Sequence, residues 1–245
     1  MKRSQFIITG ASRGIGEQLS LMLLENGFPV TGIARGQSER LMQQPGYTHI
    51  HYDLADHDGL DALIQSQIHT VQDDIELVCL INNAGMLEPL KAIERCSAKE
   101  IEHHFQVSLV TPIILTSAFI RHTKKLNIKR KVINLTSGSG TYPAPHMSVY
   151  CTAKAGINMF TQCVGAEQQF TENSVEIIAV DPGMVDTDMQ RQARSQDREA
   201  FEMGPAFQQA YETGQLLAKE EIGRHLLRLI GVSFDTGKLV MYSDG

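Results

Sequence analysis

The sequence predicts a doubly wound α/β fold, with a parallel sheet of seven strands and helices on both faces. Short β-type runs alternate with longer helical patterns along the chain, which is typical of βαβ units. Several runs, such as LVCLI at 77–81, are apolar throughout, as expected of strands that helices cover on both sides. The expected strands are 5–9, 29–34, 49–52, 76–81, 131–135, 175–180 and 238–241.

Helical patterns separate these strands. An apolar row at three- and four-residue spacing predicts a helix after the first strand, and Gly27 is placed to end it. A longer pattern covers 97–124, and we expect a kink at Pro112 because proline lacks a backbone donor. A third helix is predicted over about 148–170.

Composition and charge favour one globular domain over residues 1–245. The net charge is −6, without long runs of like charge, which argues against nucleic acid or an anionic membrane as partner. No apolar run approaches the ~20 residues that cross a bilayer. The four cysteines lack CxxC spacing and are expected to be free thiols, Cys79 in the core, in a cytoplasmic protein.

A glycine-rich turn follows the first strand directly, with the sequence TGASRGIG at 9–16. Its glycines permit a sharp turn and the close approach of a pyrophosphate, while free N–H groups at the helix start favour negative charge. The spacing is GxxxGxG rather than GxGxxG. With a strand before it and a helix after it, the turn predicts a Rossmann-like dinucleotide site.

TGASRGIG resembles the cofactor motif of the short-chain dehydrogenase/reductase family. The likeness covers nearly the whole chain, and further family landmarks recur in the right order at strand ends and on the following helices. These are Asp53, Asn82 to Gly85, Ser137, Tyr150, Lys154, Pro182, Gly183 and Thr187. The compact length and the ending GKLVMYSDG are most similar to the sepiapterin and bacterial benzil reductases, which act on vicinal dicarbonyl compounds.

The resemblance implies a set of cofactor-binding residues. They are Gly10, Ser12, Arg13, Gly14, Ile15, Gly16, Arg35, Asp53, Asn83, Ala84, Gly85, Tyr150, Lys154, Pro182, Gly183, Val185 and Thr187. Asp53 is similar to the residue that bonds the adenine amino group; alternatively it caps a helix over 55–68. Thr187 and the Val185 backbone correspond to the residues that hold the nicotinamide carboxamide.

The end of the second strand favours NADP(H) over NAD. No carboxylate stands there to bind a ribose 2′-hydroxyl, and Arg35 follows the strand instead. Arg13, inside the glycine-rich turn, is placed to reach the same 2′-phosphate, and two guanidiniums can form forked, charge-assisted bonds to it. The alternative is that each arginine is only a solvated surface charge.

Tyr150 and Lys154 are four residues apart on a predicted helix and therefore share one face. A positive charge about 4 Å from the phenol is worth on the order of 4 kcal/mol at an effective dielectric of ~20. This equals roughly 3 pK units, so we expect the lysine to bring the phenol from its ordinary pKa toward working pH.

The resemblance assigns the substrate oxygen to Ser137, thirteen residues before Tyr150, with Ser139 as a weaker candidate. It also places Lys154 on the nicotinamide ribose. The family commonly has asparagine where this chain has Ser108. A serine hydroxyl can bind water, so a modified proton relay is expected, although a catalytically weak protein becomes more credible.

We therefore expect NADPH-dependent reduction of a ketone or vicinal diketone, with Tyr150 as proton donor. The alternatives are a non-catalytic NADP-binding sensor or scaffold, and a 3-oxoacyl thioester reductase. Family members usually pair through the long helices beside the fifth strand, so a homodimer or homotetramer is expected.

The polar stretch 188–217 predicts two short helices that form a substrate lid. Methionines of this region and a facing loop suggest an apolar pocket; alternatively they only pack the lid onto the domain. The residues are Met184, Met189, Met203, Pro143, Pro145, His146 and Met147. No metal is expected, because the histidine pairs lack the carboxylate or cysteine ligands of a metal site. These pairs, His49 with His51 and His103 with His104, are interpreted as surface residues.

Overall fold

Seven parallel strands form one sheet with the order β3-β2-β1-β4-β5-β6-β7. The computed structural model describes residues 3–72, 74–196 and 201–242. The strands are β1 (Ser4–Thr9), β2 (Val30–Ala34), β3 (Tyr47–His51), β4 (Leu77–Asn82), β5 (Lys129–Leu135), β6 (Glu176–Asp181) and β7 (Leu239–Met241). The predicted doubly wound sheet is confirmed, and both ends of every predicted strand lie within two residues of the observed ends.

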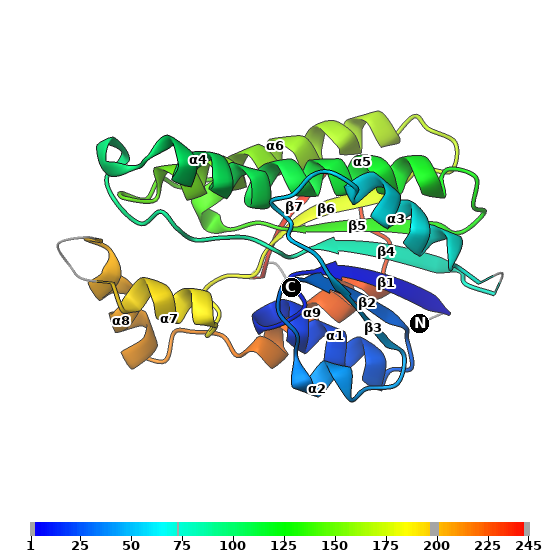
Figure 1. The fold of residues 1–245 in the computed structure, drawn as a ribbon, viewed down its shortest axis with the longest axis horizontal. Helices are drawn as coiled ribbons and strands as arrows, with labels where there is room; N and C mark the ends of the chain where they lie inside the picture. The colour runs from blue at the N-terminus through cyan, green and yellow to red at the C-terminus, as the bar shows by residue number, and fades with distance from the viewer. Residues whose placement is uncertain (1–2, 73, 197–200, 243–245) are drawn as a thin grey trace.

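Helices cover both faces of the sheet (Figure 1). One face carries α3 (Leu60–His69), α4 (Ala98–Phe105), α5 (Thr111–Thr123) and α6 (Ser148–Gln168). The other carries α1 (Gly14–Glu25), α2 (Glu39–Met42) and α9 (Lys219–Gly231). Two further short helices, α7 (Asp188–Arg194) and α8 (Gly204–Glu212), lie beside the sheet. They occupy the stretch predicted as a lid, of which residues 197–200 fall outside the described residues.

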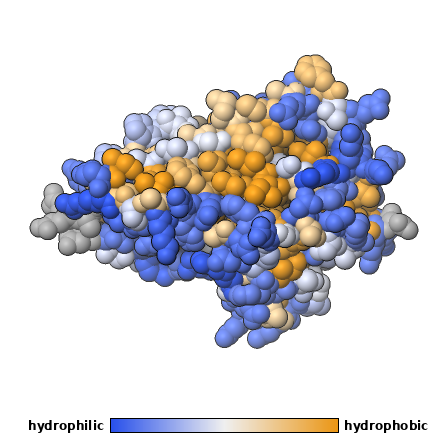
Figure 2. Space-filling view, turned by 45° about the horizontal axis from the view of Figure 1, so that its top comes forward, coloured by the Kyte–Doolittle hydropathy of each residue, from blue (hydrophilic) through white to orange (hydrophobic). Residues whose placement is uncertain are grey.

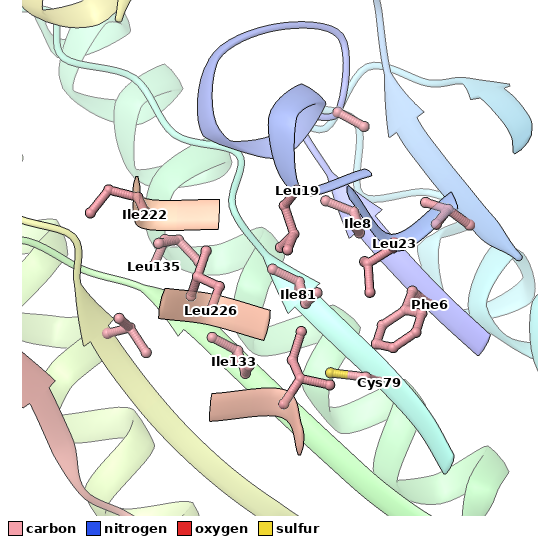
Figure 3. Packing of buried hydrophobic residues seen from close by; sticks show 14 of the residues in the cluster. Phe6, Ile8, Leu19, Leu23, Cys79, Ile81, Ile133, Leu135, Ile222 and Leu226 are labelled. Atoms are coloured by element: carbon pink, nitrogen blue, oxygen red, sulfur yellow. The ribbon is translucent and has the colours of Figure 1, made fainter. Parts of the chain in front are cut away.

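Burial on both faces explains the strands that are apolar without alternation. All six residues of β4 are buried. Figure 3 shows Phe6, Ile8, Leu19 and Leu226 in the core that β1 and its neighbouring strands form with α1 and α9. Cys79 lies in the same core and has no exposed surface, so its prediction as a core residue is confirmed.

Successive strands are added in one direction from β1 to β3 and in the opposite direction from β4 to β7, so β1 has β2 on one side and β4 on the other. In doubly wound sheets such a reversal opens a crevice at the carboxyl ends of the strands, where ligands bind. The loops after β1, β4, β5 and β6 all leave the sheet at this edge, because the strands are parallel. They contain the residues predicted to form the site.

The long helix predicted over 97–124 is interrupted one turn earlier than expected. Residues Gln106–Val110 form a π-helical turn between α4 and α5, and Pro112 itself lies in the first turn of α5. Pro112 has no N–H to donate to the carbonyl four residues before it, and the preceding turn has the wider hydrogen-bond pattern of a π-helix. The kink prediction is therefore corrected from Pro112 to 106–110.

Residues 98–123, which span α4 to α5, are the stretch among the described residues with the length and mean hydropathy to cross a membrane. Within it, the most apolar 18 residues have a mean hydropathy of 1.2, and 44% of these 18 residues are buried inside the protein. Leu115, Ala118 and Phe119 pack in the core beneath α5. Part of the stretch is therefore buried in the core of the protein.

The turn between β1 and α1 requires glycine at position 10 for both its backbone conformation and its close packing. Gly10 has φ +67°, and a Cβ added there would lie 2.9 Å from the Cα of Ala84. Gly27 has φ +78° with nothing within 4 Å, so it isolates the cost of the backbone conformation. We expect Gly10→Ala to lower the free energy of unfolding by about 3 kcal/mol and Gly27→Ala by about 1 kcal/mol, measured by urea denaturation. Equal losses would contradict the close packing of the two loops.

Candidate active site

The glycine-rich turn is fastened to the loop after β4. The Nδ2 of Asn83 donates to the carbonyl oxygens of Thr9 and Gly10 at 2.9 and 3.1 Å. The backbone N–H of Ala84 donates to the Thr9 Oγ1 at 3.0 Å. These bonds give Asn83 and Ala84 a structural function, namely to hold the turn open at the edge of the sheet.

The start of α1 fits the phosphates of a dinucleotide. Arg13 is its N-cap residue in an extended conformation, and no side chain caps the first turn. The N–H groups of that turn are therefore available to an anion. Thr187 closes the opposite side, since a Cβ added at Gly14 would lie 3.8 Å from its Cγ2.

The two arginines expected at a 2′-phosphate are both exposed, and each faces a carboxylate. The Arg35 Nη1 is 3.8 Å from Asp53, and the Arg13 Nη1 is 4.0 Å from Asp188. Exposed pairs at such distances contribute little free energy, so a phosphate could replace the carboxylates. Ser12 lies beside the end of β2, because a Cβ added at Gly36 would be 3.6 Å from its Oγ.

Asp53 does not cap a helix over 55–68. The helix begins at Leu60, and Gly59 is its N-cap residue. The Asp53 carboxylate instead accepts a hydrogen bond from the N–H of Ala55 at 3.0 Å. The capping alternative is thereby excluded, and Asp53 stays a candidate for the adenine.

Ser137, Tyr150 and Lys154 come together at the carboxyl end of β5. The Ser137 side chain lowers the pKa of the Tyr150 phenol as its hydrogen-bond partner. The N–H of Ser139 donates to the Ser137 Oγ at 3.2 Å and so orients it. One helical turn on, the Lys154 Nζ lies 5.7 Å from the centre of the Tyr150 ring.

The expected lowering of the tyrosine pKa is wrong for the protein without a cofactor. The pKa of Tyr150 is raised to about 12, mainly because the phenol is buried. The bond with Ser137 lowers this pKa in part, and the Asp181 carboxylate raises it. The expected lowering assumed a charge about 4 Å from the phenol and left out the cost of removing the phenolate from water.

Lys154 is itself buried, with 6% of its surface exposed. Its Nζ donates to the carbonyl oxygen of Leu135 at 2.8 Å. Burial lowers the pKa of Lys154 to about 8, although Asp181 opposes this shift. An ammonium with a pKa near neutrality can both stabilise an anion and give up a proton.

Ser108 lies next to this group, inside the π-helical turn. Its hydroxyl accepts a hydrogen bond from the N–H of Met86 at 3.0 Å and is almost fully buried. A Cβ added at Gly85 would be 3.6 Å from the Lys154 Nζ and 4.0 Å from the Ser108 Oγ. The absence of a side chain at Gly85 therefore keeps the space between the lysine and the serine open.

His104 is a neighbour of the site that the sequence pattern does not reveal. His104 was interpreted as a surface residue, but it is fully buried and its ring meets that of Tyr150 edge-on, with centroids 6.1 Å apart. Burial lowers the pKa of His104, and its Nδ1 is paired with the Glu88 carbonyl oxygen. His49 is similarly misassigned, because both its ring nitrogens are buried.

Tyr150 belongs to an apolar cluster that includes residues of the predicted lid. The buried members of this cluster are Leu87, Leu90, Met147, Tyr150, Ala193 and Phe201, and Met189, Met203 and Phe207 pack against it. Met147, Met189 and Met203 thus pack the predicted lid onto the domain, which is the alternative interpretation of these methionines. Met184, Pro143 and Pro145 are exposed. Phe201, a residue that the sequence analysis did not single out, is the largest fully buried side chain of the cluster.

The loop after β6 completes the edge of the site. The N–H of Gly183 donates to the Asp181 Oδ1 at 2.9 Å, so the turn at Pro182 is fixed from the strand end. Val185 is buried and bridges to Leu217. Thr187 is the N-cap residue of α7, and its Oγ1 accepts from the N–H of Gln190 at 3.4 Å.

Comparison with known proteins agrees with this geometry. The sequence matches the family model described as short chain dehydrogenase over residues 5–198. It is 36% identical over 245 residues to a benzil reductase ((S)-benzoin forming) of Bacillus cereus, covering 97% of this chain and 98% of that protein. It is 27% identical over 259 residues to sepiapterin reductase of Bos taurus, covering 99% and 95% of the two chains.

A solved structure shows the same architecture. The KRED1-Pglu enzyme superposes with a TM-score of 0.84 at 25% identity, covering 97% of this chain and 100% of that one. The family resemblance predicted from the glycine-rich turn and the later landmarks is confirmed. The chain is an oxidoreductase that belongs to the short-chain dehydrogenase family.

Proposed function

We propose that this protein reduces a ketone or vicinal diketone to an alcohol with NADPH, and that Tyr150 donates the proton. The main support for this proposal is that Ser137 is the hydrogen-bond partner of Tyr150, with the buried ammonium of Lys154 one helical turn away. The similarity to a benzil reductase over the full length supports a dicarbonyl substrate. The apolar cluster over Tyr150 suits a substrate with bulky apolar substituents.

The glycine-rich turn, Arg13, Arg35 and the loop after β6 would hold the dinucleotide, which supplies the hydride when bound. Ser137 would hydrogen-bond the substrate oxygen and thereby fix the carbonyl beside Tyr150. The phenol would then transfer its proton to that oxygen. A pKa of about 12 keeps the phenol protonated at neutral pH, which suits a proton donor.

Lys154 would stabilise the phenolate that remains after proton transfer and would bind the ribose hydroxyls. Its burial makes this attraction stronger than it would be in water. The open space at Gly85 and the Ser108 hydroxyl offer room for a water that returns a proton to the pair. We therefore assign Ser108 to the relay in place of the usual asparagine.

Two alternatives follow from the sequence. Ser108 is the feature that favours an NADP-binding sensor or scaffold without turnover, and the hydrogen-bonded Ser137 and Tyr150 argue against it. A 3-oxoacyl thioester reductase would use the same proton donor on a different substrate. Activity on acyl-carrier substrates above that on small diketones would favour the thioester reductase.

The assembly is a proposal of the same kind. Figure 2 shows apolar side chains gathered in a band over the face of the helices that lie above the sheet in Figure 1. Met159 on α6 is 60% exposed. We expect a homodimer or homotetramer that buries this face, in a cytoplasmic protein.

The first test removes the proton donor. We expect Tyr150→Phe to lower kcat for the reduction of benzil roughly 10²–10⁴-fold, because the proton donor is lost, while NADPH affinity falls far less because the other cofactor-binding residues remain. NADPH absorbance and fluorescence would measure the two effects. A wild-type protein that binds NADPH but consumes none with diketones, aldehydes or quinones would support the sensor instead.

The second test concerns cofactor choice. We expect Arg35→Ala and Arg13→Ala each to raise KM for NADPH about 10- to 100-fold, because a charge-assisted bond to the 2′-phosphate is lost. KM for NADH should change little. Arg3→Ala, which removes an exposed arginine at the opposite edge of the sheet, is the matched control. Equal losses with both dinucleotides would contradict the assignment.

The third test is the pH dependence of reduction. Because the pKa of Lys154 is lowered to about 8, its ammonium is present below this pH and is lost as the pH rises through it. We therefore expect kcat/KM for diketone reduction to be level below about pH 8 and to fall above it. A flat profile up to pH 10 would show that the lysine charge is not required.

A further inference from the structure

Asp181, at the carboxyl end of β6, lies against the turn that carries Ser137. Leu135 and Val180 are register partners, so the residues that follow them leave the sheet side by side. A Cβ added at Gly138 would lie 3.3 Å from the Asp181 Oδ2. The other carboxylate oxygen accepts the N–H of Gly183 at 2.9 Å, which fixes the orientation of the group.

Asp181 forms no ion pair with the described residues, unlike the carboxylates of Asp53, Asp186 and Asp188. Its charge acts instead on Tyr150 and Lys154, the two groups proposed to exchange protons. Asp181 raises the pKa of Lys154 and also raises the pKa of Tyr150, in each case after the larger effect of burial.

We propose that Asp181 is a positioning residue for proton transfer, whose carboxylate holds the protons on both Tyr150 and Lys154 and so extends reduction to higher pH. This inference rests on the proposed function. Reduction requires a protonated phenol, whereas alcohol oxidation requires the phenolate. A fixed negative charge beside the pair stabilises the ammonium and opposes the phenolate.

Removal of this charge has a defined sign. Tyr150 and Lys154 titrate as a coupled pair, so the first proton leaves with an apparent pKa that belongs to both. Without the carboxylate, that proton leaves at lower pH, whichever of the two groups releases it.

Other groups also face the phenol. His104 on α4 meets its ring, and Cys151 on α6 raises its pKa. Both remain in place when Asp181 is changed.

A purely structural function of Asp181 would be to fix the turn at Gly183. Asparagine keeps a side-chain oxygen at the same place to accept that N–H, while it removes the charge. Asp181→Asn therefore separates the two functions. Asp181→Ser, which also offers an acceptor, serves if the asparagine variant folds poorly.

The matched control is Asp235→Asn. Asp235 carries the same charge but is exposed in the loop before β7. In this loop, the N–H of Gly237 donates to the carbonyl oxygen of Ile177, near the amino end of β6. It therefore lies at the opposite edge of the sheet from Asp181. Both variants change the net charge by the same amount.

The experiment is a titration of the tyrosinate absorbance in the near ultraviolet with NADP⁺ bound. The chain has six tyrosines and no tryptophan, so the difference from the corresponding Tyr150→Phe protein isolates Tyr150. The same variants are assayed for the pH profile of benzil reduction.

We expect Asp181→Asn to move the Tyr150 titration and the fall in reduction about one pH unit lower, with the wild-type rate largely kept at low pH. Asp235→Asn should move neither. An unchanged titration in Asp181→Asn, or an equal shift in both variants, would overturn the proposal, as would a change confined to substrate KM.

Failure of the proposed function gives a different result. A wild-type protein without carbonyl reductase activity would refute the function, yet the spectroscopic titration would still report the effect of Asp181. Reduction with an unshifted titration would refute only the inference on Asp181.

Discussion

Lys154 holds its ammonium inside the protein with a single hydrogen bond to a described residue, the carbonyl oxygen of Leu135. An ammonium has three donors, and removing its charge from water costs several kcal/mol, so this arrangement is strained electrostatically. The lowered pKa of Lys154 is the consequence. Ribose hydroxyls and a phenolate are the partners that would relieve it, and the fold places Tyr150 and an open space at Gly85 on either side.

The parallel sheet makes this burial possible. β5 ends at Leu135, and the helix that carries Tyr150 and Lys154 packs back over the same strand end. β6 brings the Asp181 carboxylate to the same edge, and β4 brings Gly85. The π-helical turn before Pro112 turns Ser108 inward toward Met86, so an irregularity in one helix supplies a hydroxyl beside the lysine. The ammonium and the phenol, both on α6, and the carboxylate at the end of β6 are thus assembled at one edge of the sheet.

The sequence predicted much of this arrangement because strands and motif spacing are local features. The runs of β4 and β5, the glycine-rich turn and the four-residue spacing of Tyr150 and Lys154 each follow from short-range pattern. The direction of the tyrosine pKa did not, because desolvation depends on atoms from distant segments. His104 was assigned to the surface since a polar residue on a helix gives no sign of the ring it meets. α9 was missed although Ile222, Leu226 and Ile230 repeat every four residues. Asp181 was passed over because an aspartate before Pro182 is equally typical of an ordinary turn.

A structure of the protein crystallised with NADPH tests the central claim most directly. We expect the Lys154 Nζ within hydrogen-bond distance of the nicotinamide ribose and the Tyr150 hydroxyl beside the nicotinamide ring, still bonded to Ser137. A lysine that points into solvent, or a phenol well away from the ring, would contradict proton donation by Tyr150 and with it the assignment of this protein as a carbonyl reductase.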